Sequence, residues 1–534
     1  MKNRTPASLI LAVALLAPGV AAQDRTARGR NSSRPPEVDV LAGAVDAISR
    51  MHMDEFSDST LWEAAIDGLI SALNDPYAEL FTAQEADAWE ERTTGNYSGI
   101  GLQITLLNES VTVTAVFRGF PANEVGIVVG DVIVGVNEND ASDWTTNMAA
   151  DSIRGPEGTD VLVKIRRSGY DESLDFDITR AAVHVPAVNY GTLESDIGYV
   201  VMDRVARGAA EEMSAALDDL GDRRGLILDL RGNPGGFLDE SLDLADLFLE
   251  VGSTLASTVQ RMPGSSVANP ETRSFTDRRR QRVPDLPIVV LVDEFTASGA
   301  EILAGALQDY DRALVLGKRT FGKGVVQTVM PLPHDRRLRF TIGTWLTPLG
   351  RSLQRARDSQ GQLLDEDVDT LRSVSTAGGR MLLDGGGIFP DLEIPRDTLL
   401  LVEQNLVREA SELQFPLGLR IAEFGFSVAV LRRAAGEAPG VREDEFDDFV
   451  EALIQEGLPV DLIEDPIVRD YLSWRGRIAV AQRMSDFGAE ADVRKERDAV
   501  LAEAIRLLES TTSQVELFRA VDDLTPTGGT GVSR

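Results

Sequence analysis

The chain has 534 residues, a formal net charge of −33, no cysteine and three histidines. Its length predicts about three or four domains. The negative charge argues against nucleic acids and anionic membrane surfaces as partners, because both are bound through clustered Lys and Arg. The composition also excludes disulfides and thiol nucleophiles. With so few histidines and no HExxH motif, we expect neither a metal nor a cofactor.

The N-terminus has the pattern of a signal peptide. Lys2 and Arg4 supply positive charge, residues 9–16 form a short apolar stretch, and small residues lead up to Ala22. We therefore expect cleavage of residues 1–22 and an exported mature chain, secreted or in the periplasm of a bacterial cell envelope. An uncleaved N-terminal anchor is the alternative. No later stretch is long and apolar enough to predict an integral membrane segment.

Residues 23–95 are predicted to be a polar linker followed by a helical region. Residues 62–73 place apolar side chains along one face of a helix. These side chains are Trp62, Ile66, Leu69, Ile70 and Leu73. Asn74-Asp75-Pro76 then ends that helix. From Asn96 to residue 180 the pattern changes to short strands separated by glycine turns, as expected of a small β-domain.

Residues 181–397 alternate predicted strands with predicted helices, which is typical of an α/β layer. The predicted strands cover 197–202, 225–230, 287–292, 313–316 and 338–345. The predicted helices cover 209–220, 239–249 and 299–307. Residues 398–534 are predicted to be helical and acidic, with a disordered Thr/Gly-rich tail.

Ser298 is the first candidate nucleophile. It lies between an apolar predicted strand and a predicted helix, where unpaired N–H groups and the helix dipole would face an oxyanion. An ordinary N-cap serine has the same context, and the G-x-S-x-G elbow is absent. A serine hydroxyl also needs a base. Neither His184 nor His334 has a sequence context that pairs it with Ser298, so a Ser-His-Asp triad is not favoured.

Lysine is the remaining base, if burial lowers its pKa toward ~7–8. Lys323 lies between two glycines after a predicted strand, although most lysines in such loops are simply solvated. Residues 317–323 also fit the Walker pattern, but Gly324 stands where Ser or Thr must hold Mg²⁺, so we reject a nucleotide site. Residues 229–236 read DLRGNPGG and end another strand in a turn whose free N–H groups can face an anion.

Several strings resemble the carboxyl-terminal processing peptidases, also called tail-specific proteases. They occur in the family's order over roughly residues 40–397, and they are GNYSGIGLQI, GFPANEVGIVVGDVIVGVN, RGPEGT, GLILDLRGNPGG, FTASGAEILAGALQD, TFGKGVVQ, TPLGRSLQ and GGGIFPDLEIP. The resemblance implies an α/β multidomain chain. Its ClpP/crotonase-like α/β protease core would carry an inserted PDZ domain, with helical N- and C-terminal regions.

The resemblance also implies roles for individual residues. Ser298 would be the nucleophile and Lys323 the general base of a Ser–Lys dyad, with Gln327 positioning the lysine. Asp309 matches an acidic residue that is sometimes grouped with the dyad. The oxyanion hole would be formed by backbone N–H groups, namely those of Gly299 and of Gly235 or Gly236. The PDZ loop that binds a substrate's C-terminal carboxylate would be Gly99, Ile100, Gly101 and Leu102.

These inferences predict a serine endopeptidase of the cell envelope that recognises proteins by their C-termini. The predicted divisions are 1–22, 23–95, 96–180 (PDZ), 181–397 (peptidase core) and 398–534. A non-catalytic binding scaffold, with a PDZ domain and a peptidase-like core, is the alternative. An HtrA-like protease is not favoured, because the sequence lacks the His-Asp-Ser order that such a protease requires. Glycine follows Ser298 where many relatives have alanine. An insertion between Gln354 and Gly385 is expected to affect the substrate channel, and the C-terminal helices are candidates for forming a homodimer or docking an adaptor.

Overall fold

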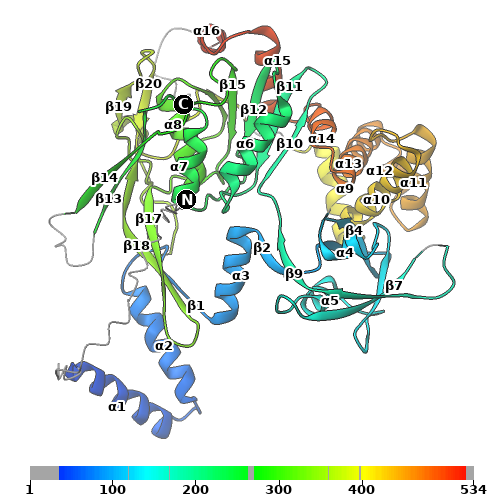
Figure 1. Cartoon of the computed structure of the whole chain (residues 1–534), viewed down its shortest axis with the longest axis horizontal. Coiled ribbons are helices and arrows are strands. Elements are labelled where there is room, and N and C mark those ends of the chain that lie inside the picture. Colours follow the sequence, from blue (N-terminus) through cyan, green and yellow to red (C-terminus); the bar gives the residue numbers. More distant parts are fainter. Residues whose placement is uncertain are drawn as a thin grey trace, which may run out of the picture.

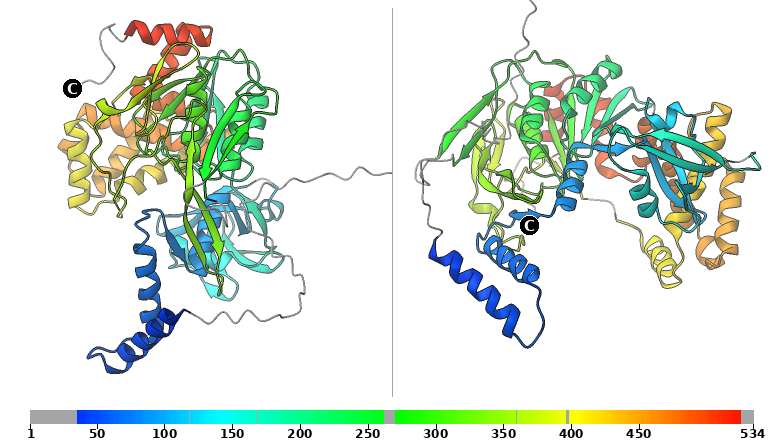
Figure 2. Two further views of the ribbon diagram at one scale, coloured as in Figure 1. Left: turned by 90° about the vertical axis from the view of Figure 1, so that its left-hand side faces the viewer. Right: turned by 60° about the horizontal axis from the view of Figure 1, so that its bottom comes forward.

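The computed structural model describes residues 35–117, 119–167, 169–261, 270–358, 360–395 and 398–524. The predicted signal peptide and the Thr/Gly-rich tail from 525 onward lie outside these residues. Figure 1 shows four parts: projecting N-terminal helices, a small β-domain, a central α/β core and a C-terminal group of helices. The same separation is visible in both views of Figure 2.

The N-terminal part is mostly helical. Its elements are α1 (Pro36–Met51), α2 (Asp58–Ser71), β1 (Glu79–Phe81) and α3 (Ala83–Thr94). The helix predicted over residues 62–73 is confirmed as α2, but its apolar face is not covered, and the side chain of Leu69 is 66% exposed. Helix α3 begins with a capping box in which Thr82 and Glu85 exchange hydrogen bonds.

The small β-domain is a five-strand path, β3-β4-β5-β7-β8, in which β6 also pairs with β5. The elements are β2 (Asn96–Gly99), β3 (Leu102–Leu107), β4 (Ser110–Val116), α4 (Pro121–Glu124), β5 (Val132–Val136), β6 (Asn139–Asp140), α5 (Thr146–Ile153), β7 (Asp160–Arg166), β8 (Leu174–Thr179) and β9 (Ala181–His184). Strands β2 and β9 pair as a ribbon that joins this domain to the core. The turn after β3 also contacts helix α10 (Leu417–Ala435), because the Asn108 N–H donates to Glu423 Oε1 at 2.6 Å.

The core sheet has the strand order β10-β11-β12-β15-β16-β21 and is parallel except for β10. Its strands are β10 (Val188–Thr192), β11 (Ile197–Met202), β12 (Gly225–Asp229), β15 (Ile288–Val292), β16 (Leu314–Gly317) and β21 (Leu392–Glu393). Every residue of β15 is buried, as expected for a parallel strand covered on both faces.

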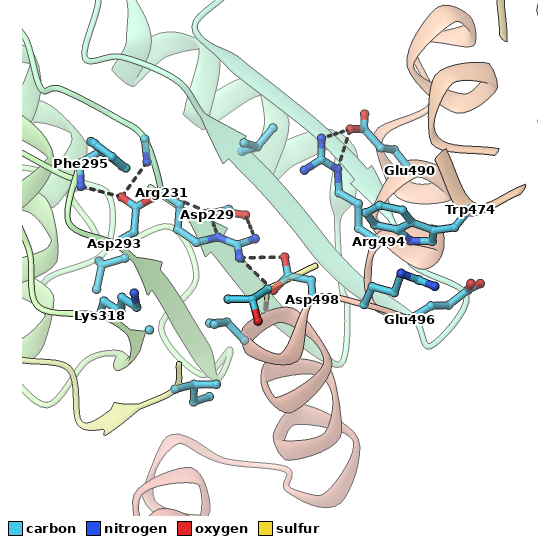
Figure 3. A pocket seen from close by; sticks show the side chains of 18 of the residues that line it. Asp229, Arg231, Asp293, Phe295, Lys318, Trp474, Glu490, Arg494, Glu496 and Asp498 are labelled. Carbon is cyan, nitrogen blue, oxygen red and sulfur yellow. Dashed lines mark hydrogen bonds and ion pairs between the residues drawn. The ribbon is translucent and has the colours of Figure 1, made fainter. Parts of the chain in front are cut away.

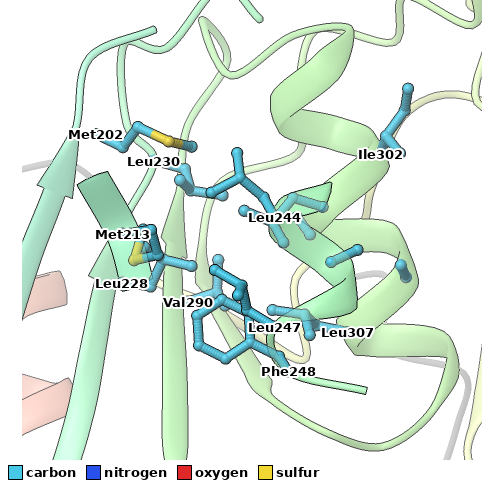
Figure 4. Packing of buried hydrophobic residues seen from close by; sticks show 14 of the residues in the cluster. Met202, Met213, Leu228, Leu230, Leu244, Leu247, Phe248, Val290, Ile302 and Leu307 are labelled. Atoms are coloured by element: carbon cyan, nitrogen blue, oxygen red, sulfur yellow. The ribbon is translucent and has the colours of Figure 1, made fainter. Parts of the chain in front are cut away.

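Different helices cover the two faces of this sheet. The first face packs against α6 (Ala209–Leu220), α7 (Leu238–Asp246) and α8 (Gly299–Asp309). Figure 4 shows part of this layer, in which Leu228 and Val290 of the sheet face Leu244, Phe248 and Leu307. The second face packs against residues of α14 (Phe487–Arg494), α15 (Ala499–Ser510) and α16 (Gln514–Leu524). The last helices therefore complete the core, although the sequence analysis placed them in a separate region.

A second sheet lies beside the core and is built around β18. Strand β18 pairs with β1, β17 and β13, and β13 pairs with β14. Its other strands are β13 (Thr254–Gln260), β14 (Glu271–Thr276), β17 (Val325–Pro331) and β18 (Arg337–Leu346). The segment after β18 contains the short helix η1 (Val368–Thr370) and a ribbon of β19 (Arg372–Ser375) and β20 (Met381–Asp384).

The remaining C-terminal helices form their own apolar cluster beside the small β-domain (Figure 1). They are α9 (Leu401–Glu412), α10, α11 (Glu443–Gln455), α12 (Val460–Ile463) and α13 (Pro466–Met484). Across the described residues, no single helix combines the length and apolar character needed to cross a membrane. Helices α9 and α10 meet that test only as a pair bent by 103°.

Candidate active site

Ser298 lies in the turn between β15 and α8, at the carboxyl end of a buried parallel strand. Its backbone has φ 52° and ψ −115°, whereas an ordinary N-cap residue is extended. Strain of this kind costs on the order of 1–3 kcal/mol and collects at functional sites. Asp293 stabilises the turn, because its Oδ1 accepts the N–H groups of Phe295 and Thr296 at 3.1 and 3.0 Å. The turn therefore holds Ser298 in a fixed and strained position that a plain helix cap does not need.

The glycine-rich turn after β12 lies directly against Ser298. Gly235 has φ 87°, and a Cβ added there would lie 2.5 Å from the Gly299 nitrogen and 2.8 Å from the Ser298 Cβ. The Gly235 N–H already donates to Asn233 Oδ1 at 2.9 Å. Within the described structure, the N–H groups of Gly236 and Gly299 have no such acceptor. A Cβ added to Gly299 would lie 3.1 Å from the Gly236 nitrogen, so these two donors are neighbours. The geometry therefore favours Gly236 over Gly235 among the predicted oxyanion donors.

Asn233 fixes this arrangement and was not singled out from the sequence. Its side chain is fully buried and its Nδ2 donates to the Met202 carbonyl at 2.9 Å. Its own carbonyl accepts the N–H of Ala297, the residue before Ser298, at 2.9 Å. One side chain and its backbone thus tie β11, the glycine-rich turn and the Ser298 turn together.

A buried carboxylate, Glu301, connects the Ser298 turn to the loop that carries Lys323. Glu301 Oε2 accepts the backbone N–H groups of Ser298 and Lys323, both at 2.8 Å. Oε1 accepts the Gly322 N–H at 2.8 Å and the Thr320 hydroxyl at 2.5 Å. Burial raises the pKa of Glu301, although these hydrogen bonds oppose the rise. The two predicted catalytic residues therefore share one acceptor through their backbones.

Sequence reasoning missed Glu301, although a signal for it exists. The spacing from Ser298 to Glu301 is that of a capping box, S-x-x-E, and the glutamate does accept the N–H of the serine as in that motif. The sequence gives no sign that the same carboxylate also reaches the loop before β17.

The Lys323 side chain is largely withdrawn from water. Its Nζ lies 5.0 Å from the centre of the Tyr77 ring. Burial lowers the pKa of Lys323 to about 8, with a smaller contribution from the nearby Arg339 cation, while Glu301 and Asp75 oppose the shift. A lysine with this pKa is partly neutral near neutral pH, as a general base must be.

The backbones of Ser298 and Lys323 are linked through Glu301, but their side chains are not hydrogen-bonded to each other among the described residues. No hydrogen bond connects Ser298 Oγ to Lys323 Nζ in the described structure, where the ammonium instead faces the Tyr77 ring. The structure therefore holds the backbones of the two predicted catalytic residues on one acceptor, and it shows no hydrogen bond between their side chains.

Gln327 contacts the segment that covers the lysine. Its Nε2 donates to the Tyr77 carbonyl at 2.9 Å. The same segment is held on β18 by Asp75, whose Oδ2 accepts the Thr341 N–H at 2.8 Å. The sequence analysis took Asp75 and its neighbours only as the end of a helix. After Asn233 and Glu301, Tyr77 is a third residue at the site that sequence reasoning missed.

Asp309 lies at the opposite end of α8 from Ser298. Its carboxylate is buried and pairs with Arg351 at 2.6 Å. It also accepts the Leu349 N–H at 2.8 Å. These contacts fix the segment after β18, and the structure brings Asp309 into contact with neither Ser298 nor Lys323.

The predicted carboxylate-binding loop, residues 99–102, joins β2 to β3 in the small β-domain. Gly101 has φ 81°, and a Cβ added there would lie 2.4 Å from the Cβ of Phe120. The Ile100 side chain is buried, and its carbonyl accepts the Ala122 N–H at 2.9 Å. Strand β3 is at the edge of its sheet beside α5. Among the described residues, the outer side of β3 has no strand partner, as strand addition by a peptide requires.

A cavity of about 960 Å³ lies behind the Ser298 turn, between the second face of the core sheet and the C-terminal helices. In Figure 3, Asp293 and Phe295 border it on one side and Trp474 and Arg494 on the other. Arg231 of the glycine-rich turn spans the floor, where it pairs with Asp229 at 2.6 Å and Asp498 at 2.8 Å. The C-terminal helices are thereby tied to the glycine-rich turn of the candidate site.

Two family models match the chain: "Peptidase family S41" over residues 196–360 and "PDZ domain" over residues 90–166. A carboxy-terminal-processing protease of Bartonella bacilliformis is 35% identical over 303 residues, which covers 56% of this chain and 68% of that protein. The chain belongs to peptidase family S41. The predicted family and fold class are thus confirmed: an α/β peptidase core with a PDZ domain and a helical C-terminal region.

Other similar proteins fit the same family. A probable CtpA-like serine protease of Staphylococcus epidermidis is 30% identical over 324 residues, covering 60% of this S41 peptidase and 64% of the relative. Among solved structures, the photosystem II D1 C-terminal processing protease is 24% identical. The match covers 67% of this chain and 93% of that one with a TM-score of 0.35, so no inference is drawn from it.

Proposed function

We propose that this S41 peptidase is a serine endopeptidase that captures protein C-termini on its PDZ domain and cleaves them with a Ser298–Lys323 dyad. One observation carries the proposal. A partly buried lysine with a pKa lowered to about 8 shares, through its backbone N–H, the acceptor Glu301 with the backbone of a strained serine. The similar proteins named carboxy-terminal-processing protease and CtpA-like serine protease support the substrate class.

Substrate capture would begin at the PDZ domain. The terminal carboxylate would bind at residues 99–102, and the tail would pair with the open edge of β3. Backbone pairing is largely independent of sequence, so side-chain pockets beside α5 would select the tail. The segment preceding the tail would then extend to the core.

Cleavage would proceed by acyl transfer. Neutral Lys323 takes the hydroxyl proton of Ser298, and Oγ forms a bond to the peptide carbonyl carbon. The N–H groups of Gly236 and Gly299 stabilise the negative charge that develops on the carbonyl oxygen. The Lys323 ammonium returns the proton to the amine as the C–N bond breaks. Neutral Lys323 then removes a proton from water as the water oxygen bonds to the ester carbonyl carbon, and the Lys323 ammonium returns that proton to Ser298 Oγ as the ester C–O bond breaks.

The resting arrangement requires one movement before this reaction. The Lys323 ammonium must leave the Tyr77 ring and turn toward Ser298 Oγ. Gln327 holds the Tyr77 carbonyl, so we assign it as a positioning residue that acts through this segment. Asp309, with its carboxylate engaged by Arg351, is given no part in the proton transfers.

We also propose that the chain works outside the cytoplasm, in the cell envelope. The signal-peptide pattern of residues 1–22 supports this location. N-terminal sequencing of the mature protein tests it, with Gln23 as the expected first residue.

The decisive test of function compares the wild-type chain with Ser298→Ala on a protein substrate carrying an apolar C-terminus. We expect cleavage only by the wild-type chain and unchanged binding of a C-terminal peptide by both. Cleavage by the alanine variant would exclude Ser298 as nucleophile. A wild-type chain that binds such tails but cleaves none would instead support the non-catalytic scaffold.

A further inference from the structure

A short hairpin packs on the outside of the Lys323 loop. It consists of residues 354–358 and 360–364, and we call it the arginine hairpin. Arg355 donates its N–H to the Gly322 carbonyl at 3.0 Å. Gln354 Oε1 accepts the Gly324 N–H at 2.9 Å. The hairpin is thus hydrogen-bonded to the glycines on both sides of Lys323. It lies at the start of the insertion between Gln354 and Gly385, to which the proposed mechanism assigns no role.

Two cations of the arginine hairpin, Arg355 and Arg357, have no acidic partner among the residues that the structure describes. Arg357 stacks over the Phe321 ring at 3.8 Å and donates only to the carbonyls of Phe321 and Gly361. Arg355 makes no side-chain hydrogen bond or ion pair with any described residue. The Nε of each arginine is buried and unsatisfied. The adjacent Arg319, by contrast, pairs with Glu366.

An unneutralised pair of cations is unexpected in a chain with a net charge of −33. Burial lowers the pKa of Arg355, and the nearby Arg319 and Arg357 cations lower it further, opposed by Glu366 and Glu301. Holding like charges together without a counterion costs free energy, which a bound anion would recover. The carboxylate of Glu301 does not serve as that anion, since its two oxygens already accept four hydrogen bonds.

The arginine hairpin lies one loop away from the nucleophile. Phe321, on which Arg357 stacks, donates its N–H to the Thr296 carbonyl at 3.0 Å, two residues before Ser298. An extended substrate advances by ~3.3–3.6 Å per residue. Phe321 therefore links the arginine hairpin to the Ser298 turn, and a substrate residue about two to four positions from the scissile bond is the one we expect to meet it.

We propose that Arg355 and Arg357 form a subsite for a substrate carboxylate close to the scissile bond. Planar guanidinium groups match a carboxylate through paired N–H donors, which gives this subsite a preference for Asp or Glu over their amides. The carboxylate comes either from an acidic side chain or from the α-carboxylate of a short tail. This inference rests on the proposed peptidase activity and names an element of its substrate preference.

The test uses the full chain and peptides that differ by a single Glu or Gln at each of four positions on either side of the cleavage site. We expect the wild-type chain to prefer Glu over Gln in kcat/KM at one position or more by about tenfold or more, as expected for a hydrogen bond to a charged group. Arg355→Gln and Arg357→Gln should each reduce this ratio toward one. Arg355→Lys keeps the positive charge but not the planar pair of N–H donors, so it should retain part of the Glu-to-Gln preference.

Arg273→Gln is the matched control, because Arg273 is exposed on β14 and lies over the Phe275 ring. It should keep the wild-type ratio. A second arm compares peptides ending in a free acid or an amide. A fall in the acid-to-amide ratio in Arg355→Gln identifies the α-carboxylate as the ligand, whereas a fall confined to the Glu-to-Gln ratio identifies a side chain.

The inference is overturned if the wild-type chain cleaves these peptides but neither ratio differs between it and the two glutamine variants. That result would leave the proposed function intact, because the function fails only if the wild-type chain does not cleave or Ser298→Ala does. If a glutamine variant does not fold, the salt dependence of cleavage by the wild-type chain is measured instead. Its Glu-to-Gln ratio should fall as ionic strength rises, and an unchanged ratio would count against the subsite.

Discussion

Replacing Glu301 by glutamine tests how the Ser298 turn and the Lys323 loop are held together. The amide would take its best orientation with Oε1 toward the N–H groups of Ser298 and Lys323 and with Nε2 toward the Thr320 hydroxyl. In that orientation the Nε2 donor faces the Gly322 N–H, which is also a donor. The Gly322 N–H therefore loses the carboxylate oxygen that accepts it at 2.8 Å in the wild-type chain. The variant thus keeps the shape of the site and breaks one buried hydrogen bond.

The magnitude follows from these contacts. A buried donor without a partner costs about 1–3 kcal/mol, and two remaining bonds lose the strength of a charged acceptor. The variant no longer buries a carboxylate, and this offsets part of the loss. We therefore expect Glu301→Gln to lower the free energy of unfolding by about 2–3 kcal/mol. A shift of Lys323 relative to Ser298 by about 1 Å would lower kcat by about 10²-fold.

Urea unfolding and the pH dependence of kcat/KM together measure these effects. The Glu301 carboxylate raises the pKa of Lys323, so its removal should move the apparent pKa of the activity below about 8. Glu240→Gln is the control, because Glu240 accepts the Gly208 N–H at 3.0 Å away from the dyad. It should lose stability while its kcat and pH profile stay close to wild type. A Glu301→Gln variant with wild-type kcat and pH profile would refute the coupling of the two loops.

Three further predictions concern the lysine, the core and the PDZ loop. Lys323→Met should inactivate the enzyme yet raise its free energy of unfolding at pH 7 by at most about 3 kcal/mol, since the wild-type pKa falls from 10.5 to about 8. The wild-type chain binds fewer protons folded than unfolded between these values, so its stability should rise with pH there and the variant's should not. Leu508→Ala, under Gly225 on the second sheet face, should cost about 2–5 kcal/mol in urea unfolding. Gly101→Ala should push against Phe120 and weaken binding of a tail peptide by about tenfold or more, measured by calorimetry, while Ser298 still reacts with a small acylating reagent. An unchanged stability of Lys323→Met or Leu508→Ala, or an unchanged peptide affinity of Gly101→Ala, would contradict the corresponding prediction.

The core elements beside the site were predictable because their sequence patterns are local and strong. The apolar run of residues 287–292 and the following helix appear as β15 and α8, with bounds that differ by two residues or fewer. The same local pattern made Ser298 only a candidate, because an ordinary N-cap serine has that pattern too, and the nucleophile role was added by the family resemblance.

The covering of the second sheet face was not predictable from local pattern. Helices α15 and α16 lie more than 200 residues beyond β15 in sequence, yet Leu501 and Leu517 pack on the sheet. An amphipathic helix reveals that it has an apolar face but not which surface that face covers. The division of the chain at residue 398 therefore separates helices that the core requires.

The electrostatics of the lysine also depend on distant segments. Lys323 was identified from its glycine loop and the family resemblance, but its pKa depends on burial beneath Tyr77 and on Arg339 of β18. Neither residue is near it in sequence. The same holds for the resting alignment, because only the structure shows that the ammonium faces a ring and not Ser298.

The rate of Ser298 acylation as a function of pH tests the dyad most directly. A small fluorophosphonate, located by mass spectrometry, should label Ser298 at a rate that rises with pH and levels off above an apparent pKa of about 8. Lys323→Met should lose this dependence and react far more slowly. Labelling of another residue, or the same profile in Lys323→Met, would contradict a dyad of Ser298 and Lys323.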